Sequence, residues 1–142
     1  MIRQDIYIEG IDWMVTCYYA VTGCDVDGIM QRLSEAGADR DSLSLAYDNL
    51  SSGDFNKGLC YSGHGQSVLV VGVSSSASQF FNSLVHELHH LASHIASALG
   101  YDLEGEDVCY IAGEVAGKMF PVASKFLCEH CRHRLLRKDW NN

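Results

Sequence analysis

The feature that most constrains this chain is a stretch with helical periodicity between Phe80 and Leu99. Its apolar residues recur at steps of three and four, which predicts a helix with one face built for a hydrophobic core. Ser74-Ser75-Ser76 precedes the stretch and offers an N-cap, and Gly100 follows it as a typical C-terminal glycine. The apolar positions are Phe80, Phe81, Leu84, Val85, Leu88, Leu91, Ile95 and Leu99.

The segments before this helix carry both strand and helix patterns. Residues 6–21 are rich in β-branched and aromatic side chains, which predicts a strand with a bend or bulge at Gly10. Helical patterns follow from Asp25 to near Gly37 and from about 41 to 50. Short strands are then expected at 58–62 and 67–73, joined as a hairpin through the glycine-rich segment 63–66.

After the central helix, a further helix is expected over about 105–119, and Pro121 is expected to start a last helix that ends near Leu136. The 142 residues correspond to one domain, so residues 1–142 are expected to form a single unit. The predicted class is α+β, with a small antiparallel or mixed sheet packed on the central helix and the helices that follow it.

Composition and charge exclude several classes of function. Apolar residues make up 47% of the chain and proline occurs once, which excludes a disordered or low-complexity protein. The longest uncharged apolar run, Ser67–Val73, is far shorter than the ~20 residues of a membrane span. Residues 1–117 hold four Lys/Arg against sixteen Asp/Glu, so no nucleic-acid partner is expected. The basic end, residues 118–142, is typical of a solvated helix terminus.

The start of the chain has no apolar signal core followed by a cleavage site, so a cytoplasmic protein without membrane attachment is expected. In that reducing compartment the six cysteines are interpreted as thiols and not as a disulfide framework.

Chemistry enters with His86-Glu87-Leu88-His89-His90, which fits the pattern H-E-x-x-H inside the central helix. Side chains four residues apart share a helix face, so the imidazoles of His86 and His90 can bind one Zn²⁺. Glu87, next to the first ligand, would act as general base toward a metal-bound water. A histidine-rich surface helix is the alternative interpretation, and the periodic apolar context favours zinc.

A catalytic zinc site needs a third protein ligand. His94 is poorly suited, because it lies about 12 Å from His86 along a straight helix, and we expect it at the edge of the core or beside a ligand. Glu106 falls in the first turn of the next predicted helix and is the preferred ligand, with Glu114 next. Glu104 and Asp107 are competing carboxylates, since an acidic first turn also complements the helix dipole.

Residues His86 to His90, followed by Gly100-Tyr-Asp-Leu-Glu-Gly-Glu106-Asp-Val-Cys-Tyr110-Ile, resemble the small gluzincin-type zinc metallopeptidases. The form found here is similar to short peptidases of gut bacteria and their phages, and the similarity covers about residues 67–118. The resemblance implies a minimal zincin-like domain in which His86, His90 and Glu106 bind zinc and Glu87 is the base. It also implies that strand 67–73 could hold an extended peptide substrate at an edge of the sheet, although a buried core strand fits the same residues.

Two cysteine-containing segments leave alternatives open. Cys60 suggests a peptide-deformylase-like amidase, since those enzymes combine His-Glu-Leu-x-His with an upstream cysteine ligand. Cys128-Glu-His-Cys131 with His133 resembles half of a zinc ribbon, but a second CxxC is missing from the sequence and the cysteines could equally pack against the core.

The sequence therefore predicts a zinc-dependent metallopeptidase that hydrolyses peptide bonds of a peptide or protein substrate. The alternative from another class is a non-catalytic binding or regulatory module on the same scaffold. Glu87 favours the enzyme, because a structural metal site has no use for a general base there. The substrate preference and the oligomeric state do not follow from the sequence.

Overall fold

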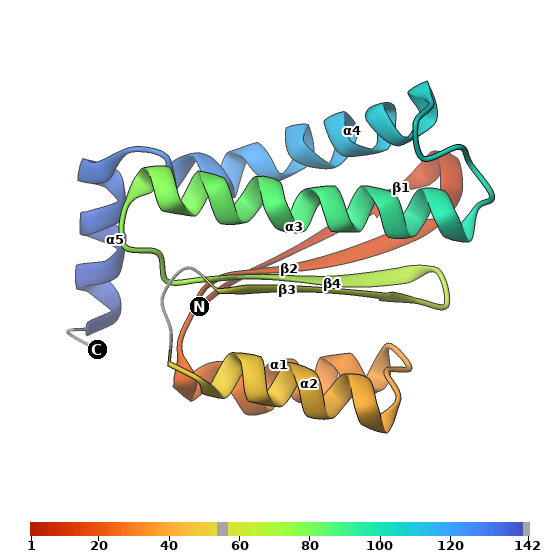
Figure 1. The fold of residues 1–142 in the computed structure, drawn as a ribbon. Helices are drawn as coiled ribbons and strands as arrows, with labels where there is room; N and C mark the ends of the chain where they lie inside the picture. Colours follow the sequence, from red (N-terminus) through yellow and green to blue (C-terminus); the bar gives the residue numbers. More distant parts are fainter. Residues whose placement is uncertain (54–56, 141–142) are drawn as a thin grey trace.

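A four-stranded mixed sheet forms the centre of the computed structural model, which describes residues 1–53 and 57–140 (Figure 1). Its strands are β1 (Ile2–Ile8), β2 (Trp13–Val21), β3 (Gly58–Gly63) and β4 (Gln66–Gly72), in the order β1-β2-β4-β3. The pairs β1–β2 and β3–β4 are antiparallel, whereas the central pair β2–β4 is parallel. The predicted α+β class with a small mixed sheet is confirmed.

Helices cover both faces of this sheet (Figure 1). Helices α1 (Val26–Glu35) and α2 (Arg40–Ser51) lie on one face, and α3 (Ala77–Ala98) and α4 (Glu106–Ala123) lie on the other. Helix α5 (Glu129–Trp140) stands at the end of the sheet where α3 begins. None of the helices in the described part of the chain combines the length and apolar character needed to cross a bilayer.

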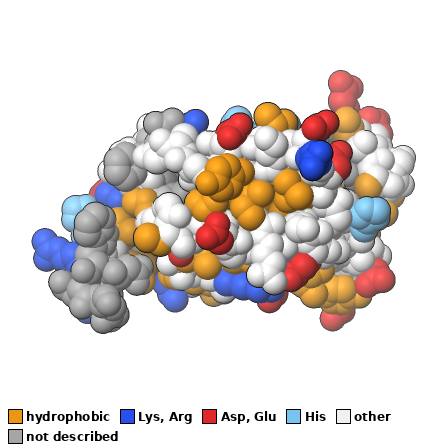
Figure 2. Space-filling model, turned by 90° about the horizontal axis from the view of Figure 1, so that it is seen from below, with side chains coloured by type: hydrophobic (Ala, Val, Ile, Leu, Met, Phe, Trp, Pro, Cys, Tyr) orange, Lys and Arg blue, Asp and Glu red, His pale blue; other side chains and the backbone are white. Residues whose placement is uncertain are grey.

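Two hydrophobic cores follow from this layering. The central strands β2 and β4 are buried on both faces and therefore read as nearly continuous apolar runs. Alternate residues point to opposite faces, so Tyr19 and Leu69 join the core under α3 and α4. Tyr18 and Val68 join the core under α1 and α2. Seen from the α1 and α2 side, hydrophobic side chains also gather near the middle of the surface among separate acidic ones (Figure 2).

The central helix predicted over residues 80–99 is confirmed as α3. Its N-cap is Ser76, whose side chain accepts a hydrogen bond from the Gln79 amide at 3.1 Å. The β3–β4 hairpin is also confirmed. Its two turn residues, His64 and Gly65, both have positive φ (54° and 76°), as a type I′ turn requires.

Two expectations about the elements need correction. Residues 6–21 are not one bent strand, because the chain reverses near Gly10 and β1 pairs with β2. Alternation alone cannot separate a long strand from two strands of a hairpin. Pro121 does not start the last helix but lies within α4, in its final turn, where a missing amide costs only one helical hydrogen bond. The last helix is instead α5, eight residues further on than expected.

Strand β4, which the family resemblance placed at an edge of the sheet, is a central strand. β4 pairs with β2 on one side and with β3 on the other, and Val68, Leu69, Val70 and Val71 are fully buried. It therefore cannot accept a further strand. In the described part of the chain the strand at this edge of the sheet is β3.

Candidate functional site

The two motif histidines lie on the exposed surface of α3 with their rings side by side. The ring centroids of His86 and His90 are 4.9 Å apart, with the planes inclined by 74°. Both side chains are exposed. Because i and i+4 share one helix face, the two imidazoles can approach one metal ion without a change in the helix.

Glu87 differs from its two neighbours, because it is 8% exposed and packs against β3. A Cβ atom added at Gly58 would lie 2.8 Å from its Cγ and 2.9 Å from its Oε1, so the carboxyl side chain rests directly on the backbone of that strand. Burial raises the pKa of Glu87, and the nearby His86 and His90 partly oppose this effect. A carboxyl group with a raised pKa is suited to accept and release a proton.

His94 continues the histidine stripe and turns toward the sheet. Its ring centroid is 6.0 Å from that of His90. Its Nδ1 lies 3.1 Å from Ser62 Oγ and 3.8 Å from Cys60 Sγ, both in β3. Burial lowers the pKa of His94, and His90 adds to this effect. The half-buried imidazole thus lies at the edge of the core, as expected from the sequence.

A chain of hydrogen bonds leads from His94 into the sheet. Ser62 Oγ is 2.7 Å from Ser67 Oγ, and the buried indole N–H of Trp13 donates to Ser67 Oγ at 2.9 Å. Sequence reasoning missed Ser62, Ser67 and Trp13 as parts of the site. Two serines that flank a Gly-His-Gly turn were the available signal, since residues flanking such a turn face each other in a hairpin.

Helix α3 and the edge strand run side by side along the site. Glu87 meets β3 at Gly58, and His94 meets it at Ser62, so both elements advance in the same direction. The outward edge of β3 therefore follows the line of the three histidines. One backbone acceptor at this strand is already used, because Asn49 Nδ2 donates to Gly58 O at 3.1 Å.

Cavities lie on both sides of β3. One of about 760 Å³ opens between the β3–β4 turn and the C-terminal half of α3. A smaller cavity of about 240 Å³ separates α2 from β3 and is lined by Leu45, Asn49 and Tyr61 among others. The larger cavity is of the size that holds small ligands or peptide side chains. Its lining includes Trp13, Tyr61, His64, Ser93, His94 and Leu103.

The structure does not bring the predicted third ligand to the two histidines. Glu106 is exposed at the first turn of α4. Helix α4 is fixed on the β1 side of the sheet, because Lys118 Nζ donates to Tyr7 O at 2.8 Å. Glu114, the second choice, pairs with that same Lys118 at 3.3 Å. Glu87, in contrast, faces β3 at the opposite edge.

Over residues 1–53 and 57–140, no group of three or more His, Cys, Asp or Glu side chains is arranged to hold a metal ion. The described residues therefore fit two ligands of a metal site, His86 and His90. Ligation by Glu106 would require the first turn of α4 to move.

Cys60, the ligand of the amidase alternative, is half-buried and faces His94. Burial raises the pKa of its thiol to about 12, and the neighbouring Glu87 adds to the shift.

Comparison of the chain with models of protein families, with curated proteins and with solved structures found no match. The resemblance of residues 67–118 to small gluzincin-type peptidases accordingly stays a prediction.

Proposed function

We propose that this protein is a zinc-dependent peptidase in which His86 and His90 hold the ion and Glu87 is the general base. The observation that supports this function is the adjacency of the two exposed imidazoles, 4.9 Å apart, to a buried glutamate at the edge strand. When bound, zinc would act as a Lewis acid toward a peptide carbonyl and would lower the pKa of a water molecule.

Glu87 carries the proton transfers of this proposal. Its carboxylate accepts a proton from the attacking water and passes it to the nitrogen of the leaving amine. The contact with Gly58 restricts the carboxyl side chain to one side of α3, so the base keeps a fixed position beside the histidines.

The substrate class that fits is an extended peptide. A peptide that added to the outer edge of β3 would gain main-chain hydrogen bonds and would run along His86, His90 and His94. The cavity of about 760 Å³ at the end of this path offers space for a substrate side chain. Ser62 and His94 would contribute polar contacts there.

Glu106 remains our proposed third ligand, with Glu114 and Cys60 as the alternatives. A non-catalytic peptide-binding module on the same scaffold is the second candidate function. The specific observation in its favour is that the described residues offer two neighbouring ligands and no third.

Metal content tests the site. The wild-type protein, purified without a metal-affinity tag, is expected to hold about one zinc per chain, and His86→Ala is expected to lose it. His89→Ala is the matched control, because His89 is exposed on the same helix outside the H-E-x-x-H positions. Zinc loss in Glu106→Ala but not in Glu114→Ala would support Glu106 as ligand. Unchanged zinc in Glu106→Ala would remove it from the site.

Hydrolysis separates the two functions. The zinc-loaded wild type is incubated with a library of peptides, and new termini are identified by mass spectrometry. Glu87→Gln is expected to retain zinc and to lose cleavage. A wild type that binds peptides without cutting any of them would instead establish the binding module, and cleavage that persists in Glu87→Gln would exclude the assigned base.

A further inference from the structure

A pair of cysteines lies apart from this site, at the first turn of α5. Cys128 directly precedes the helix and Cys131 lies in its first turn, and both thiols are exposed. The amide of Arg132 donates to Cys128 O at 2.8 Å, which closes the first helical turn. Residues three apart share one side of a turn, so the two sulfurs can meet. The alternative that these cysteines pack against the core is wrong, because both face solvent.

The two thiols have unequal environments. The backbone and thiol of Cys131 and the backbone of His130 favour the charged form of the Cys128 thiol. These contacts lower the pKa of Cys128, because they stabilise a thiolate at a helix N-terminus. Cys128 in turn raises the pKa of Cys131. Cys128 is thus the better suited of the two to attack a disulfide.

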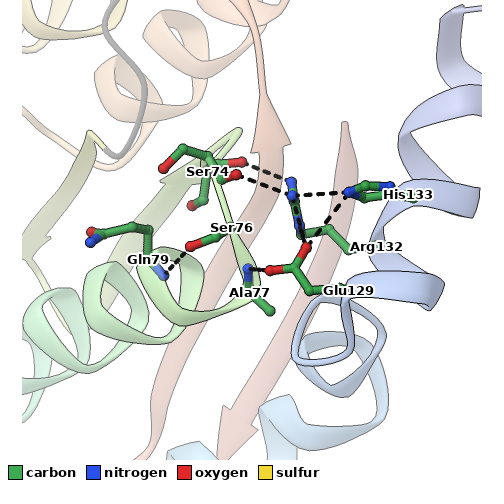
Figure 3. A network of polar contacts seen from close by, with 8 residues as sticks. Ser74, Ser76, Ala77, Gln79, Glu129, Arg132 and His133 are labelled. Atoms are coloured by element: carbon green, nitrogen blue, oxygen red, sulfur yellow. Dashed lines mark hydrogen bonds and ion pairs between the residues drawn. The ribbon is translucent and has the colours of Figure 1, made fainter.

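The turn that carries both cysteines is anchored to the start of α3 (Figure 3). Arg132 is 7% exposed and donates to Ser74 O at 2.9 Å and to Ser75 O at 3.2 Å. Glu129 accepts from the Ala77 amide at 2.6 Å and pairs with Arg132 at 3.0 Å. Because these side chains point inward, Cys128 and Cys131 are held on the outward side of the turn.

A small cationic cavity adjoins the cysteines. It has a volume of about 200 Å³ and is lined by Lys125, Cys131, Arg134 and Leu135. Arg134 also acts on Cys131, whose pKa it lowers against the larger effect of Cys128. In the described part of the chain the charged lining of this cavity is positive, which suits a ligand with carboxylate groups.

A metal is a poor explanation for the pair. The zinc-ribbon resemblance needs four ligands, and the part of the chain that the structure describes contains no group of three or more His, Cys, Asp or Glu side chains able to hold an ion. His133 contacts Glu129 Oε2 at 3.6 Å and Arg132 Nη2 at 3.4 Å. Two neighbouring thiols without further ligands are typical of dithiol–disulfide chemistry.

We propose that Cys128 and Cys131 form a thiol–disulfide exchange site that reacts with an anionic disulfide of the glutathione type. The Cys128 thiolate attacks one sulfur of oxidised glutathione, forms a mixed disulfide and releases one glutathione thiolate. Cys131 then loses its proton to solvent, attacks Cys128 Sγ and expels the second glutathione thiolate. Two electrons pass from the protein dithiol to the glutathione disulfide, and the reverse sequence of steps reduces the Cys128–Cys131 disulfide again.

Mass spectrometry of the full chain after reaction with oxidised glutathione tests this site. Wild-type protein, freed of metal with a chelator, is expected to gain a Cys128–Cys131 disulfide. Cys131→Ser is expected to trap one glutathionyl group on Cys128. Cys24 and Cys109, which are single exposed cysteines, are the internal controls, and Cys128 should react at least about tenfold faster than either.

Charge reversal tests the class of disulfide. Lys125→Glu with Arg134→Glu is expected to slow the reaction with oxidised glutathione severalfold more than the reaction with uncharged hydroxyethyl disulfide, because the loss of positive charge beside the thiols affects both reagents but only glutathione carries carboxylates. Equal slowing with both reagents would overturn the anionic specificity. Modification of Cys128 at the rate of Cys24, or a wild type that accumulates only mixed disulfides, would overturn the exchange site itself.

Discussion

Arg132 offers the sharpest test of how α5 is held on the domain. Its guanidinium is 7% exposed and donates to two backbone carbonyls and to Glu129 (Figure 3). Replacement by methionine keeps most of the side-chain volume and removes all of these hydrogen bonds. The carbonyl of Ser74, a residue that is 5% exposed, would lose its charged donor.

The magnitude follows from the three contacts. A buried hydrogen bond from a charged donor contributes about 1.5–3 kcal/mol, and the longer bond to Ser75 contributes at the low end of that range. The pair with Glu129 adds at most about 1 kcal/mol, because the Glu129 side chain is 53% exposed. The desolvation of the guanidinium offsets part of the sum. A loss of about 3 kcal/mol is therefore expected for Arg132→Met, equivalent to a fall in Tm of about 6–12 °C for a domain of this size.

The assay is urea unfolding followed by circular dichroism, with Tm from a thermal scan. Arg137→Ala is the matched control, since Arg137 is exposed on the same helix, and it is expected to change the free energy of unfolding by less than about 0.5 kcal/mol. The free energy of unfolding of Arg132→Lys should lie between those of the two variants, because lysine keeps the charge and loses the planar, forked donors of the guanidinium. An Arg132→Met protein as stable as the control would refute the reasoning.

Three further predictions concern the β3 side of the molecule and the thiols. Gly58→Ala should lower the free energy of unfolding by about 1–3 kcal/mol, since its Cβ would lie 2.8 Å from both Val70 O and Glu87 Cγ. Gly113→Ala on α4 is the control, because the added Cβ has open space there, and it should be neutral or stabilising in the same urea assay. In chelator-treated protein, Glu87→Gln should be more stable than wild type near neutral pH, because burial raises the pKa of Glu87 in the folded state. The stability that the protonated carboxyl contributes is therefore present at low pH. It is lost as the pH rises from the pKa of the unfolded state to that of the folded state. Urea titrations across that range should show the difference closing at acidic pH, and a constant difference would contradict the pKa shift. Alkylation of the native protein, followed by mass spectrometry, should modify the exposed cysteines Cys24, Cys109, Cys128 and Cys131. Cys17 and Cys60, whose pKa values burial raises to about 12, should react only after urea unfolds the chain. Early labelling of Cys60 would show that the packing at β3 is open.

The parts of the fold that the sequence predicts correctly depend on local signals. The length of α3 follows from its periodicity and its Ser76 cap, and the β3–β4 hairpin follows from two turn residues with positive φ. Likewise, the neighbouring rings of His86 and His90 follow from the four-residue spacing alone. In each case the residues that decide the structure lie within about one helical turn or one hairpin turn.

The parts that fail depend on contacts between distant segments. Trp13 and Ser67 form their hydrogen bond across 54 positions of sequence, and no local pattern marks it. The side of α3 on which α4 packs is likewise determined by contacts between distant segments. Lys118 attaches α4 to β1 through the Tyr7 carbonyl, a contact across 111 positions of sequence. The central position of β4 could not be read from its composition, because buried edge and centre strands share the same residue types.

The parallel pairing of β2 with β4 has a consequence for how the chain folds. The sheet consists of two local hairpins, β1–β2 and β3–β4, that meet along this one pairing, where Met14 lies opposite Gln66. Joining residues 52 positions apart costs about 3.5 kcal/mol of loop-closure entropy before the contacts are made. Each hairpin can form in microseconds by itself, but neither buries its apolar surface until the other arrives. The rate of folding should therefore be set by the encounter of two preformed hairpins, and substitutions at this junction should change it more than substitutions in either turn.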